Sequence, residues 1–318
     1  MRLDQQSSWR LLDEDNIDLY FTQPAVLLKG QHGDERCLYY QNKLFSGSQT
    51  FAITYQDELS QLFITKIDGG YEENADENDP VTQAELLVEH VITLNKPIII
   101  DMTSMSTEVL FILIKAFHHH NFDDIIIIYV QPQEYKKNNQ SNGIMPDFLL
   151  SEDYAPVSAI PGFLRLPDEE KEPRLIVFMG FEGGRFKELC EHLLTEGTIE
   201  IVPILPMPSF KAGWHMLGIY LNLDTLKSND IIRHLKRVTA WDPFFALAVL
   251  EEQYKNNSDS NQLIVAPIGT KPHTLASVLF AVRHESVRIM YDHPIVHGTR
   301  TEGIGAKRGY YLKGVFSS

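Results

Sequence analysis

Short, continuous apolar runs that alternate with segments of helical length constrain the fold of this chain more than any other feature. In the second half the apolar runs are RLIVFMG, IEIVPIL, LKRVTAW, LIVAPI and SVRIMYD, at 174–180, 199–205, 235–241, 263–268 and 286–292. Segments with helical patterns separate them, at 183–193, 209–228, from Asp242-Pro243 onward, and at 272–284. Fully apolar strands separated by helices indicate a parallel sheet covered on both faces. We therefore expect an α/β fold with a Rossmann-like parallel sheet over 174–318.

The first half shows the same alternation in a less regular form. Short strands are expected around AVLLKG, CLYYQ, TFAITY and LFITKI, at 25–30, 37–41, 50–55 and 62–67. A helix, a strand, a second helix and a second strand should follow at 84–94, 97–102, 106–119 and 123–130. We expect residues 1–150 to form a related or degenerate α/β domain. The proline-rich and charged stretch 151–173 is the expected linker.

Two segments share one plan of apolar strand, small or hydroxyl-bearing loop, apolar helix, apolar strand and proline. They run from 97 to 132 and from 262 to 294. An internal duplication would explain the likeness. Chance would explain it as well, because any two β-α-β units have much of this plan in common.

The charge of the chain is unevenly distributed. The formal net charge is −15, and residues 1–160 hold 10 Lys and Arg against 25 Asp and Glu. Residues 161–318 hold 18 of each kind. Since a negative potential repels a polyanion, general binding to DNA or RNA is not expected. A local pocket for a small anion in the second half remains compatible with these counts.

Cysteine content and hydropathy indicate the compartment. Cys37 and Cys190 are the only cysteines, too few for a disulfide framework or a cysteine metal cluster. No segment approaches the roughly 18 consecutive apolar residues of a membrane helix, and the first twenty residues do not follow the pattern of a secretion signal. The expectation is a cytoplasmic protein without membrane contact.

Ligands of open parallel sheets bind beyond the carboxyl ends of the strands, where loops lead into helices. One such loop is Gly269-Thr270-Lys271-Pro272, followed by His273. Glycine permits close backbone approach, proline suits a first helical turn, and the helix N-terminus offers N–H donors to an anion. Lys271 would add a positive charge, so the loop is a candidate phosphate site. It lacks the P-loop spacing, and a tight strand-to-helix turn with an exposed lysine is the simpler alternative.

A second candidate loop lies at 180–185. Its three glycines, Gly180, Gly183 and Gly184, allow a tight turn against a helix N-terminus, although they do not form a GxGxxG dinucleotide motif. Glu182 could bind ribose hydroxyls or act as a general base, and Arg185 could clamp a phosphate. A mutual ion pair of Glu182 and Arg185 is the alternative.

The corresponding turn of the first half is rich in hydroxyl groups and lacks a cation. Its candidate residues for a second half-site are Asp101, Thr103, Ser104 and Ser106. Helix capping is the expected role for these side chains.

The sequence suggests neither a cofactor nor a resident metal. The consecutive histidines 118–120 point in different directions on a helix and cannot converge on one ion. Asp292, His293 and His297 could bind a metal, but a turn at Pro294 is the simpler account. No nucleophile motif is present.

The stretch IVAPIGTKPHTLA, at 264–276, is similar to the strand, Gly-Thr-Lys and helix signature of the CRISPR-associated Rossmann fold sensors. The resemblance is specific over about a dozen residues, while the shared architecture covers 174–294. That family usually has Gly-Gly-Thr-Lys where this chain has Ile268-Gly269. The resemblance implies a cyclic oligonucleotide ligand bound at a dimer interface. It implies that Thr270 and Lys271 contact a ligand phosphate and that loop 180–185 lines the pocket.

Three classes of function follow. The first is a sensor or regulatory subunit that binds a nucleotide-like, phosphate-bearing molecule and acts through a protein partner. The expectation for this class includes a homodimer and a bacterial antiviral defence system. The second is a Rossmann-like hydrolase or transferase acting on a nucleotide or sugar phosphate, with Glu182 or Asp242 as acid or base and Lys271 as electrostatic stabiliser. The third is a scaffold subunit without a ligand. Because neither a nucleophile nor a metal set is visible, the sequence favours binding.

Overall fold

In the computed structural model of the protein, the chain divides into two compact units. Unit 1 comprises Met1–Glu134 together with Thr301–Ser318, and unit 2 comprises Tyr135–Arg300. The structure describes residues 9–31, 33–67, 79–136, 156–195, 198–294 and 301–316, and the backbone alone at 72–73, 153–154 and 295.

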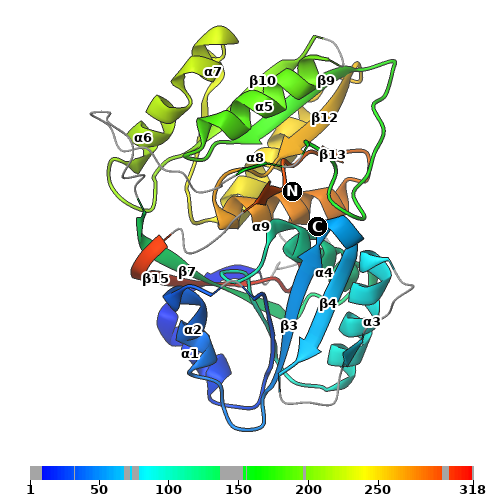
Figure 1. Ribbon diagram of the computed structural model, residues 1–318, viewed down its shortest axis with the longest axis vertical. Coiled ribbons are helices and arrows are strands. Elements are labelled where there is room, and N and C mark those ends of the chain that lie inside the picture. The colour runs from blue at the N-terminus through cyan, green and yellow to red at the C-terminus, as the bar shows by residue number, and fades with distance from the viewer. Residues whose placement is uncertain are drawn as a thin grey trace, which may run out of the picture. The chain divides into compact units, whose positions relative to one another are not determined.

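Unit 1 is built on an eight-stranded mixed sheet (Figure 1). In spatial order its strands are β1 (Arg10–Leu12), β15 (Thr301–Tyr311), β7 (Ile125–Tyr135), β6 (Ile98–Asp101), β2 (Val26–Lys29), β3 (Gln49–Gln56), β4 (Gln61–Lys66) and β5 (Glu72–Glu73). The neighbours β7, β6, β2 and β3 are parallel, and β4 joins them as an antiparallel hairpin partner of β3. The strands expected in the N-terminal half and those of the 97–130 segment therefore belong to one sheet.

The helical segments of unit 1 begin where the sequence supplies a cap. They are α1 (Glu14–Asp18), η1 (Leu19–Phe21), α2 (Glu35–Gln41), η2 (Asp57–Leu59), α3 (Pro80–Thr93) and α4 (Thr107–His119). Asp79 accepts hydrogen bonds from the first-turn amides of α3, and Ser106 does the same for α4. Helix α4 is apolar around most of its surface and is buried from residue 107 to 114, which places it in the core.

Unit 2 is built on a five-stranded sheet whose strands are all parallel. The spatial order is β11 (Lys236–Val238), β10 (Glu200–Pro206), β9 (Glu172–Phe178), β12 (Asn261–Ala266) and β13 (Arg288–Ile289). A small antiparallel pair, β8 (Asp153–Tyr154) and β14 (Pro294–Ile295), accompanies it. The parallel sheet confirms the Rossmann-like architecture expected for this part of the chain.

The helical segments of unit 2 follow the expected alternation with the strands. They are α5 (Gly183–Leu194), α6 (Trp214–Leu221), α7 (Leu223–Ser228), η3 (Ile232–His234), α8 (Pro243–Lys255) and α9 (Lys271–Arg283). Helix α5 packs against α7, and α8 packs against α9. Figure 1 shows α5 and the α8–α9 pair on different sides of strands β9 and β12. Every residue of α9 from Pro272 to Val282 is buried.

The two units share one order of parallel strands. In each, the first strand is central (β2 or β9), the second lies on one side of it (β3 or β10), and two later strands lie on the other side (β6 and β7, or β12 and β13). The similar segments 97–132 and 262–294 contain β6-α4-β7 and β12-α9-β13, which hold equivalent positions. The topology supports the expectation of a related N-terminal half.

Three expectations differ from the structure. CLYYQ, at 37–41, lies in helix α2 rather than in a strand, because Asp34 caps the helix and Cys37 and Tyr40 bury one helical face. The second difference concerns the start of unit 2. This unit begins at Tyr135 rather than after residue 150, so the described residues 156–173 of the expected linker belong to it. The third difference concerns the C-terminus. Residues 301–311 form β15, which pairs with β1 and lies beside β7 in unit 1, so unit 2 ends at Arg300 rather than at 318.

None of the helices in the described part of the chain combines the length and apolarity that a membrane crossing requires. The acidic stretch 71–78 and most of the Asn-rich stretch 133–143 lie outside the fully described residues.

Candidate functional site

The strand order of unit 2 creates a topological switch point between β9 and β12. From β9 the chain proceeds to β10 and β11 on one side and then returns to β12 on the other. Ala266 of β12 pairs with Val177 of β9, so the two strands end side by side. The loops that follow them lead in opposite directions, and ligands of open α/β sheets bind in the crevice that results.

Two glycines allow these loops to touch. A Cβ atom on Gly180 would lie 2.7 Å from the carbonyl oxygen of Ile268. A Cβ atom on Gly269 would lie 3.0 Å from the Cβ of Phe178. Larger residues at either position would force the backbones apart. The two candidate loops therefore meet at the switch point, as expected for a Rossmann-like strand order.

The first candidate loop is also held by the α6–α7 junction. Asn222 is buried, and its Nδ2 donates to the carbonyl oxygens of Gly180 at 2.9 Å and Gly218 at 2.7 Å. A Cβ atom on Gly183 would overlap the carbonyl oxygen of Leu221. Gly183 is thus needed for the packing of α5 against the α6–α7 junction, while the neighbouring Gly184 is exposed.

Arg185 is buried and forms an ion pair with Asp292 of the same unit. Its Nε and Nη2 donate to the two carboxylate oxygens of Asp292, each at 2.6 Å, and its Nη1 lies 3.6 Å from Glu182. Burial alone would lower the pKa of Arg185, but the hydrogen bonds that it donates to Asp292 hold this pKa above its usual value. Arg185 ties α5 to the chain after β13. The expected phosphate clamp is therefore not supported, because this guanidinium is engaged inside the unit.

The second candidate loop forms the capped start of α9. Thr270 is the N-cap, and its Oγ1 accepts from the His273 amide at 3.5 Å and donates to the carbonyl oxygen of Ala240 at 2.8 Å. Lys271 is the first residue of the helix and is partly exposed, and Pro272 follows it. Thr270 thus links the loop after β11 to α9, while Lys271 places a positive charge at the crevice.

His273 is a structural residue in this fold. Its side chain is fully buried, its ring lies 4.6 Å from that of Phe178, and its Nε2 lies 2.9 Å from the carbonyl oxygen of Thr239. Burial lowers its pKa to about 4, so the imidazole is neutral at pH 7 and Nε2 carries the donated proton. The side chain of His273 is therefore not available for the expected contact with a ligand.

The carboxylates considered for acid–base chemistry have structural partners. Oδ1 of Asp242 accepts from the amides of Phe244 and Phe245, both at 3.0 Å, as an N-cap does. Glu182 lies beside Arg185 with its side chain largely buried. Asp292 binds Arg185, His293 Nε2 lies 2.9 Å from the hydroxyl of Ser158, and His297 lies outside the described residues.

The equivalent turn of unit 1 is closed by its own hydrogen bonds. The carboxylate of Asp101 accepts from the Thr103 amide at 3.0 Å and from the Ser104 hydroxyl at 3.1 Å. Ser104 Oγ accepts from the amide of Gly30 at 2.9 Å, and Thr103 Oγ1 accepts from the amide of Val130 at 3.0 Å. Burial raises the pKa of Asp101 to about 6, against the hydrogen bonds that lower it. These residues, with Ser106 as the α4 cap, fit the expected capping role.

Sequence reasoning missed an aromatic cluster beside the first candidate loop. The ring of Phe181 lies 5.4 Å from that of Tyr135 and 5.7 Å from that of Trp214, and the latter two are 5.1 Å apart. Tyr135 ends β7, Trp214 begins α6, and Phe181 lies in the loop after β9, so only the fold brings them together. The only signal of this cluster in the sequence was the aromatic residue Phe181 between the candidate residues Gly180 and Glu182.

Comparisons with known proteins leave the family of this chain open. No family model matches, and no curated protein matches. Among solved structures, the ketoreductase domain from the bacillaene assembly line aligns at 10% sequence identity over 87% of this chain and 68% of that chain, with a TM-score of 0.20. A similarity of this size carries no argument about either fold or function.

Proposed function

We propose that unit 2 binds a nucleotide-like, phosphate-bearing small molecule at the crevice beyond β9 and β12, and that the protein acts as a sensor or regulatory subunit through a protein partner. The observation that carries the proposal is the switch point itself. Loops 180–185 and 269–271 meet there without intervening side chains at Gly180 and Gly269. The N-termini of α5 and α9 follow these loops, and first-turn amides are suited to phosphate.

Lys271 is the residue assigned to the ligand. It stands at the first position of α9, where its charge adds to the helix dipole. Thr270 contributes through the backbone that it orders, because its hydroxyl already bonds Ala240 and caps α9. The resemblance to CRISPR-associated Rossmann fold sensors suggests a cyclic oligonucleotide and a homodimer in a bacterial defence system, and both belong to this proposal.

The enzyme alternative has less support from the described residues. Burial raises the pKa of Cys37 and of Cys190 to about 12, so both remain thiols at neutral pH. Asp242 caps α8 and Glu182 accompanies Arg185, as described above. A scaffold without a ligand would have the same internal hydrogen bonds. It would differ from a sensor only in binding no ligand phosphate at Lys271.

The test is a binding screen with matched lysine variants. Purified protein is measured by thermal shift and calorimetry against mono-, di- and cyclic nucleotides, cyclic oligonucleotides and sugar phosphates, because a ligand that binds the folded state raises the melting temperature. Lys271→Gln should weaken binding by about tenfold or more, the usual cost of losing a charge-assisted hydrogen bond. Lys255→Gln, which removes an exposed charge at the end of α8, should bind as the wild type does.

Three results would change the conclusion. Absence of any melting-temperature rise with every ligand class favours the scaffold. Equal binding by Lys271→Gln and the wild type contradicts the assigned site. Product formation from a nucleotide or sugar phosphate that Glu182→Gln abolishes, with binding retained, favours the enzyme. Sedimentation with and without ligand tests the proposed homodimer.

A further inference from the structure

A cavity of about 470 Å³ lies in unit 2 at the carboxyl ends of β10 and β11. Its lining comes from the loop after β10, the start of α6 and strand β11, and consists of Met207, Pro208, Ser209, Ala212, His215 and Arg237. This volume falls within the range of cavities that hold small organic molecules. No side chain identified from the sequence as a site candidate belongs to the lining.

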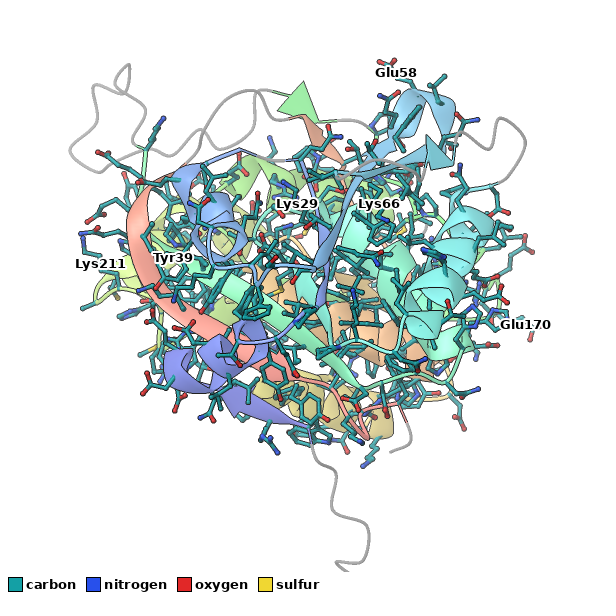
Figure 2. All side chains as sticks on the ribbon, turned by 90° about the horizontal axis from the view of Figure 1, so that it is seen from below. Lys29, Tyr39, Glu58, Lys66, Glu170 and Lys211 are labelled. Carbon is teal, nitrogen blue, oxygen red and sulfur yellow. The ribbon has the colours of Figure 1, made fainter. Side chains whose placement is uncertain are left out.

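The polar part of the lining carries positive charge without a carboxylate. Arg237 is exposed, and its guanidinium makes no hydrogen bond or ion pair with any described residue. His215 Nδ1 lies 3.4 Å from the Ser209 hydroxyl. Arg237 also ends the basic run RHLKR, residues 233–237, and Lys211 in the loop after β10 is exposed (Figure 2). The local charge therefore favours an anion.

The rest of the lining is apolar, since Met207, Pro208 and Ala212 offer only carbon and sulfur surface to an occupant. A bare inorganic ion would leave that surface without a partner. A flat organic body covers it, as in most small-molecule sites, in which an apolar wall surrounds a few oriented polar groups.

The cavity wall is held in place by hydrogen bonds. The Met207 amide donates to the carbonyl oxygen of Val238 at 2.7 Å, and the Ala240 amide donates to that of Pro208 at 2.9 Å. The Ser209 hydroxyl donates to the Lys211 carbonyl oxygen at 2.6 Å and accepts from the His215 amide at 3.3 Å. The loop after β10 is thus fastened to β11 at one end and to α6 at the other, so an occupant meets a preformed wall.

We propose that this cavity is a second ligand site, for a small organic anion with a flat apolar body. Arg237 pairs with the carboxylate or phosphate of the ligand, for which its planar guanidinium is suited. His215 adds a hydrogen bond, and the flat body packs on Met207, Pro208 and Ala212. An aromatic carboxylate and a nucleoside monophosphate share this chemistry. The proposal does not depend on the switch-point function, because no lining residue belongs to it.

The experiment uses three probes on the full chain: 2-naphthoate, AMP and inorganic phosphate. Binding is measured by calorimetry and by ligand-observed NMR. Arg237→Gln removes the charge, and Ala212→Leu fills part of the cavity. Arg233→Gln removes an equal charge from the exposed η3 turn outside the lining and serves as the matched control. Unchanged melting temperatures of the variants establish that each is folded.

We expect 2-naphthoate or AMP to bind the wild type, and the probe that binds shows whether the ligand anion is a carboxylate or a phosphate. Arg237→Gln and Ala212→Leu should each weaken that binding by about tenfold or more, the first through a lost charge-assisted bond and the second through overpacking. Arg233→Gln should leave it unchanged, and any part of the AMP binding that Lys271→Gln removes belongs to the switch point.

The proposal is overturned if neither organic probe binds at millimolar concentration, or if both lining variants bind as the wild type does. Binding of inorganic phosphate alone also overturns it, because the apolar wall would then have no role. Loss of binding in Lys271→Gln with retention in Arg237→Gln would assign the probe to the switch point and remove the cavity site while supporting the proposed function.

Discussion

The two units have the same order of parallel strands, yet their switch points differ in chemistry. In unit 1, the carboxylate and hydroxyl groups of the turn from Asp101 to Ser106 form hydrogen bonds with neighbouring backbone and side-chain groups. In unit 2, the equivalent turn is shorter by one residue before the helix cap and places Lys271 directly after Thr270. The same fold thus has one turn whose polar side chains bond within unit 1 and another that places a lysine at the first position of its helix. Strand order determines where the two loops meet, and the loop sequence determines which side chains line that place.

The helix after the first strand extends the comparison, because each unit has an arginine in its first turn. In unit 1, Arg36 pairs with Asp34 at 2.7 Å, and the two side chains are 12% and 13% exposed. In unit 2, Arg185 pairs with Asp292, whose side chain is 0% exposed. The difference in exposure predicts different costs of breaking each pair.

The largest expected effect is that of Asp292→Asn. The substitution leaves the Arg185 charge buried without its carboxylate, which should cost about 3–5 kcal/mol in the free energy of unfolding. Asp34→Asn should cost less, because water reaches that pair. Urea unfolding followed by circular dichroism measures both values. In the double variant Arg185→Met with Asp292→Leu, part of the loss should be recovered, since the buried guanidinium is removed together with the carboxylate of Asp292 and only Glu182 remains of the charged cluster.

If Asp34→Asn were as costly as Asp292→Asn, burial would not be the factor that separates the two arginine pairs. If the double variant were less stable than Asp292→Asn alone, the packing of α5 rather than charge burial would explain the loss.

The second effect is the dependence on pH that Asp101 contributes in unit 1. Burial raises the folded-state pKa of Asp101 to about 6, above the ordinary value of 3.8. The folded state therefore binds the proton more tightly than the unfolded state does. The stabilising contribution of Asp101 is complete below about pH 4 and is lost as the pH rises through about 6, an effect of up to about 3 kcal/mol. The unfolding free energy of the wild type is measured from pH 4 to pH 8 and compared with that of Asp101→Asn.

As the pH rises, the unfolding free energy of the wild type should fall relative to that of Asp101→Asn, because Asn does not titrate. A constant difference over this range would show that Asp101 has the same pKa in the folded and unfolded states. His273 in unit 2 titrates as well, with a pKa lowered to about 4, but it is present in both proteins and cancels in the comparison.

The sequence predicted the parts of the fold that continuous apolar runs define. Strands β9, β10 and β12 overlap the expected segments and differ from them by one or two residues at each end, and the start of α8 at Asp242-Pro243 is where the cap signal placed it. Strand β15 was missed because TEGIGAKRGYY is rich in small and charged residues, and its extended form is stabilised by pairing with β1 and β7. Such pairing between distant segments leaves no local pattern.

The candidate site was predicted in position but less well in detail. The two loops meet as expected from the topology, whereas the partner of Arg185 lies 107 residues away in the sequence. The burial of His273 had a visible signal, since α9 is apolar on nearly all sides and offers no exposed face for a histidine in its first turn. The charge of Arg237 was visible too, but the cavity beside it depends on how the loop after β10 folds back.

The smallest expected effect concerns the two helix caps at the switch points. Ser106 accepts one bond, from the amide of Val109 at 3.3 Å, whereas Thr270 caps α9 and also donates to the carbonyl oxygen of Ala240. Loss of a cap costs about 0.5–2 kcal/mol. Thr270→Val should exceed Ser106→Ala within this range, because Ala240 also loses its donor. Both values come from urea unfolding. If the two costs were equal, the bond to Ala240 would add nothing, and the loop after β11 would not depend on α9 for its position. If Thr270→Val cost more, the same hydroxyl would be shown to stabilise both the start of α9 and the loop that runs from β11 to Asp242.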